Sequence, residues 1–210
     1  MKEIINNKIS AENICPIDKI EEFEKIKNPE ELLSFMKDNI TYGFVGKDNE
    51  KIYSPKQKRW GVGEQPEQKL QSPEEILKSG HGTCWEQTEF EKQWFAKNNF
   101  EFKTFLLMFK EDISQKNPAH TFLVYKKDDD WYWFENALDK HNGIHKFDNL
   151  DDLIENVKVK LINNAINYGA TKDDIKKYKL CEYDTPAYGC STDEFISNII
   201  DNNPPLISEK

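Results

Sequence analysis

Three segments of the chain begin with a helix-capping pattern and continue with apolar residues at helical spacing. They start at Asn28-Pro29-Glu30-Glu31, at Ser72-Pro73-Glu74-Glu75 and at Thr83-Cys84-Trp85-Glu86. A polar cap and a Glu three residues later provide hydrogen bonds for the free N–H groups of a helix start, and Pro suits the first helical position. The second segment stops at Gly80, and the third should end near Asn98. We therefore predict three helices, the last of which begins with a cysteine.

Beyond residue 100 the apolar residues follow a strand pattern instead of a helical one. Segments 102–109, 120–125 and 131–135 are rich in aromatic and branched apolar residues, which is typical of strands. The polar run 126–130 separates the last two segments and predicts an antiparallel hairpin. One interpretation of the aromatic run 131–134 is the lining of a ligand groove. Aromatic residues at both even and odd positions are more typical of a strand with core layers on both sides, which we predict here.

These elements fit one α+β domain. A further capped helix is expected over 148–157, and weaker apolar segments follow at 161–166 and 195–200. We predict a core over 28–157, an N-terminal extension over 1–27, and a helical C-terminal extension over 158–210 that packs on the same domain. The polar stretch between residues 43 and 71 is long for a loop, a length usual for functional or disordered segments.

The composition fits a folded domain with an acidic surface. Of 210 residues, 37% are hydrophobic and 12% aromatic, and the net charge is -9 with a pI near 5.1. An acidic chain argues against nucleic acid or a membrane as partner, because both favour a basic surface. The chain start lacks the apolar core of a secretory signal, and no segment has the length of a membrane-spanning helix. We therefore expect a cytoplasmic protein, with its oligomeric state left open.

The cysteines are expected to be free thiols. They stand at irregular spacing, at Cys15, Cys84, Cys181 and Cys190. Disulfides are rare in the cytoplasm, so a cysteine role should be catalytic, metal-binding or packing.

Cys84 occupies a position that lowers the pKa of a thiol. The free N–H groups and the dipole of a helix N-terminus favour the thiolate, which is the nucleophilic form. Gly82 removes side-chain bulk where a substrate would approach, and the Cys84 N–H can point at a tetrahedral oxyanion. A cysteine at a helix start is more often a buried core residue, so this position alone does not establish catalysis.

A histidine and a carboxylate lie at the two ends of the predicted hairpin that meet in space. His120 opens the first strand and Glu135 closes the second. Antiparallel pairing brings these ends together, as a base and its orienting acceptor require. A five-residue turn sets His120 opposite Asn136, whereas a four-residue turn sets it opposite Glu135, so both are candidate orienters.

Two blocks of the chain together resemble a known superfamily. Residues 72–87 form a short helix, a glycine-rich turn and a cysteine that opens a long helix. Residues 120–125 begin with His, and the Trp-led run 131–135 ends on an acid. In this order the blocks resemble the transglutaminase-like superfamily, over roughly residues 28 to 155.

The resemblance implies a papain-like fold, in which the cysteine helix packs on an antiparallel sheet that carries the histidine and the acid. It implies acyl transfer through a Cys84 thioester, with His120 as base and Glu135 as orienter, on a peptide, protein or small amide. The family's acid is usually Asp, commonly followed by Pro where Asn136 stands here. Alignment with the motif favours Glu135. The alternative is a binding or scaffold protein with this fold and weak or no catalysis.

The family often supplies an oxyanion donor upstream of the cysteine. The resemblance offers several candidates for oxyanion or substrate contacts, namely Trp60, Gln65, Gln68, Gln71, Trp85 and Gln87. A packing role for Trp60 fits the sequence equally well.

No cofactor or metal is expected. His141 and His145 are four residues apart, but Asn142-Gly143 between them makes a turn, so they are not a helical metal-binding pair. His81, three residues before Cys84, is expected to support a turn.

Overall fold

The computed structural model describes residues 16–45, 51–52, 69–109, 119–167, 170–176, 178–184, 188–202 and 207–208. These residues form the α+β fold expected from the sequence, built on one antiparallel sheet with the strand order β10-β9-β5-β6-β7-β8. Its strands are β5 (Glu101–Phe109), β6 (Ala119–Lys127), β7 (Asp130–Glu135), β8 (Gly143–Phe147), β9 (Tyr178–Glu182) and β10 (Ile207–Ser208). Two small ribbons pair β1 (Thr41–Tyr42) with β4 (His81–Gly82), and β2 (Phe44–Val45) with β3 (Lys51–Ile52).

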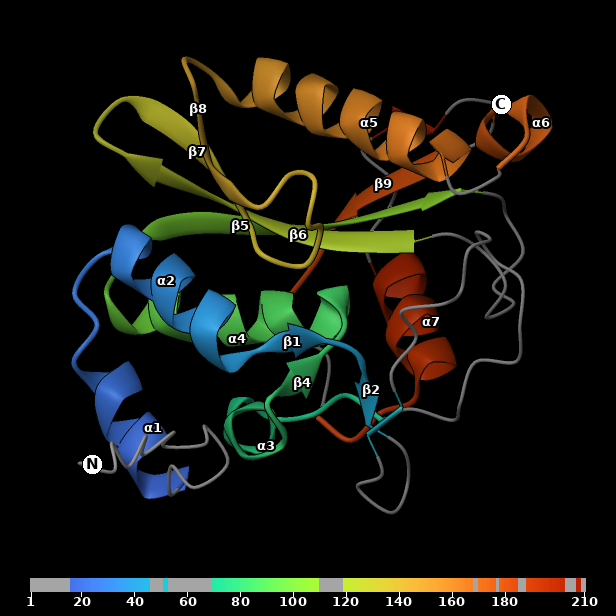
Figure 1. Cartoon of the computed structure of the whole chain (residues 1–210). Helices are drawn as coiled ribbons and strands as arrows, with labels where there is room; N and C mark the ends of the chain where they lie inside the picture. The colour runs from blue at the N-terminus through green and yellow to red at the C-terminus, as the bar shows by residue number, and fades with distance from the viewer. Residues whose placement is uncertain are drawn as a thin grey trace, which may run out of the picture.

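Helices cover both faces of the sheet (Figure 1). One face carries α5 (Leu150–Asn167), with the short α6 (Lys172–Ile175) following it. The other face carries α4 (Cys84–Lys97) and α7 (Thr192–Asn202). Around α4 lie α1 (Pro16–Glu24), α2 (Pro29–Asn39) and α3 (Pro73–Ser79).

The three predicted capped helices form where their capping patterns place them. The Asn28 side chain accepts a hydrogen bond from the Glu31 N–H at 2.8 Å, and Ser72 forms a reciprocal capping box with Glu75. Helix α3 ends at Gly80, whose φ of 68° lies in the left-handed region that favours glycine. The chain then passes through β4 directly into α4, so the Gly80 turn sets the direction in which Cys84 enters the fold.

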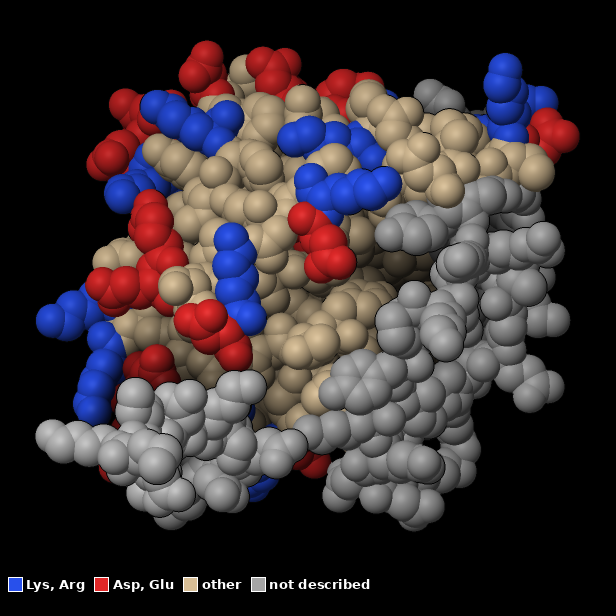
Figure 2. Space-filling view, in the orientation of Figure 1, with Lys and Arg blue, Asp and Glu red and all other residues tan. Residues whose placement is uncertain are grey.

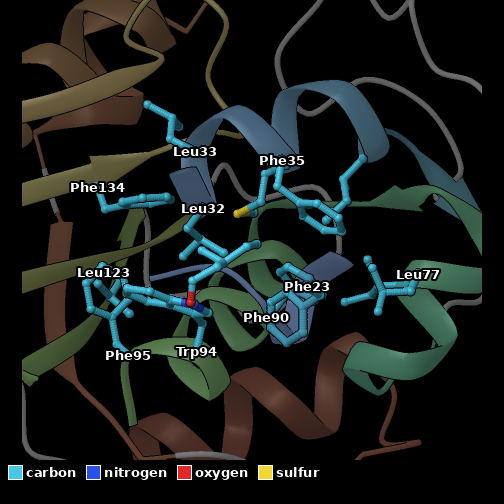
Figure 3. Packing of buried hydrophobic residues seen from close by; sticks show 14 of the residues in the cluster. Phe23, Leu32, Leu33, Phe35, Leu77, Phe90, Trp94, Phe95, Leu123 and Phe134 are labelled. Atoms are coloured by element: carbon cyan, nitrogen blue, oxygen red, sulfur yellow. The ribbon is translucent and has the colours of Figure 1, made fainter. Parts of the chain in front are cut away.

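The first hydrophobic core fixes α4 against the central hairpin (Figure 3). Phe90, Trp94 and Phe95 of α4 pack in one buried cluster with Leu123 of β6 and Phe134 of β7. The Phe95 and Phe134 rings meet edge to face with centroids 5.5 Å apart. Burying each such side chain contributes roughly 1.5–3 kcal/mol, so this cluster anchors the helix that carries Cys84.

The opposite face of the same strands forms a second core under α5. Phe122 and Val124 of β6 and Trp133 of β7 belong to a cluster that includes Leu153 and Val157 of α5. Neighbouring residues of β6 and β7 thus point to opposite layers, as the alternation of a strand requires. The two-sided burial predicted for the aromatic strand is confirmed.

The turn of the central hairpin is shorter than the polar run 126–130 predicted. Lys127 pairs with Asp130, which leaves a two-residue turn with Asp128 at a φ of 57°. Asp tolerates this left-handed conformation better than most residues because its short side chain can hydrogen bond locally. The expected turns of four and five residues are both wrong, so His120 faces neither Glu135 nor Asn136 directly in the pairing of β6 with β7.

Residues on both sides of the predicted 28–157 core contribute to the hydrophobic cores and to the sheet. Strand β9 pairs with β5 inside the main sheet, so residues 158–210 are not a purely helical extension as predicted. Helix α5 runs on to Asn167, well past the expected end at 157. Phe23 and Ile26, from the predicted N-terminal extension, belong to the first core.

Charged side chains of both signs are interspersed over the face shown in Figure 2. Among the described residues, no helix combines the length and apolar character needed to span a membrane.

Candidate active site

Cys84 is the first residue of α4, and a buried carboxyl group holds the turn before it. The Glu86 carboxylate accepts hydrogen bonds from the Thr83 backbone N–H at 2.8 Å and from the Thr83 hydroxyl at 3.1 Å. The side-chain amide of Gln71 donates to the same carboxylate at 2.8 Å. Burial raises the pKa of Glu86, and these hydrogen bonds oppose the rise. The Glu half of the predicted capping box therefore fixes the position from which Cys84 enters the helix.

The carbonyl of Gly82 ties the same turn to the hairpin. It accepts a hydrogen bond from the side-chain amide of Gln87 at 2.8 Å. The Gln87 carbonyl oxygen in turn accepts from the Asn136 side chain at 2.7 Å. A buried chain of hydrogen bonds therefore connects the turn before Cys84 with the residue after Glu135.

His120 and Glu135 form a buried pair. The imidazole Nε2 lies 2.8 Å from Glu135 Oε2, and the two residues are 5% and 2% exposed. The other carboxylate oxygen, Oε1, accepts the backbone N–H of Leu138 at 2.9 Å. Both oxygens of Glu135 are thus engaged, which fixes the carboxylate and through it the plane of the imidazole.

The pair meets diagonally across the hairpin. Leu123 pairs with Phe134, and the same register continued places His120 opposite Ala137. Glu135 lies two residues before Ala137 and therefore on the same face, within diagonal reach of a long side chain. The extra methylene of Glu relative to Asp suits this diagonal approach.

The thiol of Cys84 is hydrogen bonded to the imidazole of His120. Because Nε2 faces Glu135, the nitrogen that faces the sulfur is Nδ1. Burial raises the pKa of Cys84, but hydrogen bonding and charge from His120, together with two hydrogen bonds from Thr121, lower it to a net value below 9.0. The three side chains that the sequence singled out are thus brought together in one connected site.

The pKa of His120 shifts in the opposite direction. Burial alone lowers it, but the charge of Glu135 and hydrogen bonds to Cys84 and Glu135 raise it to about 10. A thiol with a lowered pKa beside an imidazole with a raised pKa favours a thiolate–imidazolium pair over a neutral thiol and a neutral imidazole. That pair is the resting form of a thiol nucleophile with its general acid and base in place.

Asn136 takes a structural role next to the pair. Its amide donates to Gln87, and its backbone and side-chain oxygens accept from the Asn142 amide at 3.1 and 3.0 Å. The acceptor that contacts His120 is Glu135. The geometry therefore favours Glu135 over Asn136 as orienter.

The residues predicted to contact the oxyanion or the substrate either make other contacts or lie outside the described residues. Trp85 is 5% exposed and packs edge to face against Phe195, so it is a core residue. The amide of Gln87 is committed to Gly82 and that of Gln71 to Glu86 and the His81 carbonyl. Trp60, Gln65 and Gln68 lie outside the described residues.

The remaining histidines lie in turns and against an aromatic ring. His81 is buried, and its Nδ1 lies 2.7 Å from the Ser79 carbonyl, as expected of a turn residue. His145 Nε2 lies 2.7 Å from the His141 carbonyl, and both rings pack on Trp133. Within the described ranges, no three His, Cys, Asp or Glu side chains gather as a metal site would require.

Two polar residues near Cys84 were missed from the sequence. Thr121 is the residue after His120 on β6, and it lies on the strand face that also carries Leu123 and Tyr125. Glu91 lies on α4, seven residues after Cys84. Burial raises the pKa of Glu91 well above its ordinary range, and the charge of Glu135 adds to the rise. The available signal was a polar residue at a core-facing position of a periodic element.

The ionisation of Cys84 predicts a distinctive alkylation profile. The rate of Cys84 alkylation by iodoacetamide, followed by peptide mass spectrometry, should have a pH midpoint below that of an ordinary thiol. Cys190 is also partly exposed, but burial raises its pKa, so its rate should still climb with pH over the same range. In His120→Ala the Cys84 midpoint should move upward, because burial then acts without the imidazolium. Equal profiles for Cys84 and Cys190 in the wild type would contradict this account.

The two candidate orienters predict different effects on His120. In Glu135→Gln the pKa of the imidazole, followed by NMR titration, should fall far below about 10, because the charge that opposes burial is gone. In Asn136→Ala that pKa should stay unchanged, while unfolding should become easier by about 1–3 kcal/mol because the buried Gln87 oxygen loses its donor. An Asn136→Ala protein whose His120 pKa falls as far as that of Glu135→Gln would reverse the assignment.

No known protein-family model matches the chain, and no curated protein matches its sequence.

Proposed function

We propose that the protein is a thiol-dependent enzyme that transfers or hydrolyses acyl groups through a thioester on Cys84. The observation that carries the proposal is the continuous contact from the Cys84 thiol through the His120 ring to Glu135, with 2.8 Å between the last two groups. Peptide, protein and small-amide substrates all undergo this chemistry. The proposal includes the papain-like arrangement implied by the resemblance, because helix α4 presents Cys84 to an antiparallel sheet that carries the other two residues.

The first half of the proposed reaction forms the thioester. The Cys84 thiolate attacks the substrate carbonyl carbon, and the carbonyl electrons move to oxygen to give a tetrahedral oxyanion. The Cys84 N–H at the first position of α4 is a suitable donor to that oxygen, since the first N–H groups of a helix have no intrahelical acceptor. When the intermediate collapses, the bond to the leaving group breaks, and the His120 imidazolium gives its proton to the departing amine or alcohol.

The second half returns the enzyme to its resting state. A water molecule or an amine attacks the thioester carbonyl while neutral His120 removes its proton. The carbon–sulfur bond then breaks, its electron pair stays on sulfur, and the thiolate–imidazolium pair is restored. Glu135 stabilises the imidazolium in both halves and keeps the ring in one orientation.

An acyl-enzyme experiment tests the proposal. Wild-type protein mixed with a p-nitrophenyl ester should release a burst of p-nitrophenolate, and acid quenching followed by peptide mapping should find the acyl group on Cys84. Cys84→Ala should abolish the burst, and His120→Ala should slow it by about 10²- to 10⁴-fold. A primary amine added to the reaction should appear in the product if the acyl group passes to amines.

Cys190→Ala is the matched control, because Cys190 is a partly exposed cysteine outside the site and its loss should leave the burst intact. Acylation spread evenly over the cysteines, or a burst that survives in Cys84→Ala, would contradict the enzyme proposal. That outcome would favour a binding or scaffold role.

A further inference from the structure

Thr121 contacts the sulfur of Cys84 through two different groups. Its backbone N–H and its hydroxyl are both hydrogen bonded to the Cys84 thiol. Thr121 is only 3% exposed, so water does not compete freely for these contacts. Hydrogen bonds to an ionised acceptor are stronger than those between neutral groups, and donors aimed at the sulfur therefore favour its thiolate.

The ending of the β6–β7 ladder explains why the Thr121 N–H faces the thiol. Thr121 pairs with Leu106 of β5 on one side. On the other side, the described ladder between β6 and β7 ends at the pair Leu123–Phe134, two residues further along β6. Within the described ladder, Thr121 therefore has no partner residue on β7, and its backbone N–H is hydrogen bonded to the Cys84 thiol instead.

Thr88 orients the Thr121 hydroxyl. It lies one helical turn after Cys84 on α4, is 2% exposed, and its hydroxyl lies 3.2 Å from that of Thr121. A hydroxyl has one hydrogen to donate and two lone pairs to accept. When Thr121 accepts from Thr88, its own hydrogen is left for the sulfur.

The other titratable groups around the thiol do not supply positive charge. His120 is the cation of the site, and Glu135 lies behind it on β7. Glu91 on α4 and Tyr183 beyond β9 also interact with Cys84 electrostatically, and burial raises the pKa of both, which favours their neutral forms. Apart from His120, the stabilisation of a thiolate here falls to neutral hydrogen-bond donors.

We propose that Thr121 is a further catalytic residue, whose backbone N–H and hydroxyl hold the Cys84 sulfur in its thiolate form, and that Thr88 is the positioning residue for that hydroxyl. The inference rests on the proposed nucleophilic role of Cys84. It gives Thr121 its largest role in the second half of the reaction. There the carbon–sulfur bond breaks after His120 has taken the proton of the attacking water or amine, and the negative charge that returns to sulfur is met by the two Thr121 donors.

The test compares the pH midpoint of Cys84 alkylation by iodoacetamide in the wild type and in single variants. Thr121→Val keeps the shape and the backbone N–H but removes the hydroxyl, and it should raise the midpoint by about one unit, a tenfold change in the ionisation constant. Thr121→Ser should restore the wild-type midpoint. Thr88→Val should shift the midpoint in the same direction by a smaller amount, since it only loosens the hydroxyl of Thr121.

Thr104→Val is the matched control for the loss of a buried hydroxyl. Thr104 lies on β5, is 2% exposed, and its hydroxyl donates to the Tyr183 carbonyl at 2.5 Å, whereas the hydrogen-bond partners of the thiol are His120 and Thr121. It should lower the thermal stability of the protein and leave the Cys84 midpoint in place.

Two results would overturn the inference and are distinguishable from each other. A low wild-type midpoint that Thr121→Val does not change, or that Thr104→Val raises equally, removes the role of Thr121 and leaves the proposed function standing. A wild-type Cys84 that titrates as an ordinary thiol overturns the inference together with the proposed function.

Discussion

The hydrogen bond between His120 and Glu135 is the interaction on which the site depends. Both residues are almost fully buried, and an imidazolium there would be costly without a carboxylate at 2.8 Å. Breaking a buried ion pair by removing one partner typically costs about 3–5 kcal/mol, because the other charge is stranded. The same pairing gives His120 the raised pKa that in turn favours the Cys84 thiolate. Cys84, His120 and Glu135 therefore behave as one electrostatic unit.

The fold holds this unit from two sides. The hydrophobic cluster of Phe90, Phe95 and Phe134 fixes α4 against the hairpin without directional preference. The orientation of α4 is set by buried hydrogen bonds. Glu86 binds the turn before Cys84, and the Gln87 side chain binds Asn136 after the end of β7. Buried hydrogen bonds of this kind add rigidity and positional specificity to a core that is otherwise held by apolar packing. Polar residues in the layer between α4 and the sheet are thus part of the site as well as of the fold.

The sequence predicted the local elements and the three site residues because both leave strong one-dimensional signals. Capping patterns identified α2, α3 and α4. A cysteine at a helix start, with a histidine and an acid at hairpin ends, pointed to the candidate site, and the family resemblance favoured Glu135 over Asn136. The hairpin register was not predictable, because the run 126–130 offers several polar residues for a turn that uses two. Strand β9 was missed because five residues carry little periodicity. Thr121 was missed because its role depends on a three-dimensional contact with α4.

The central claim is that His120 and Glu135 hold a proton beside Cys84 and thereby lower the pKa of its thiol. The most direct measurement is a pH titration of the thiolate ultraviolet absorbance, taken as the difference between the wild type and Cys84→Ala. The expected difference has its midpoint below the ordinary pKa of a thiol, because the imidazolium of His120 lies beside the sulfur. A difference that appears only at pH 9.0 or above would show that Cys84 is an ordinary buried thiol, and would contradict the account.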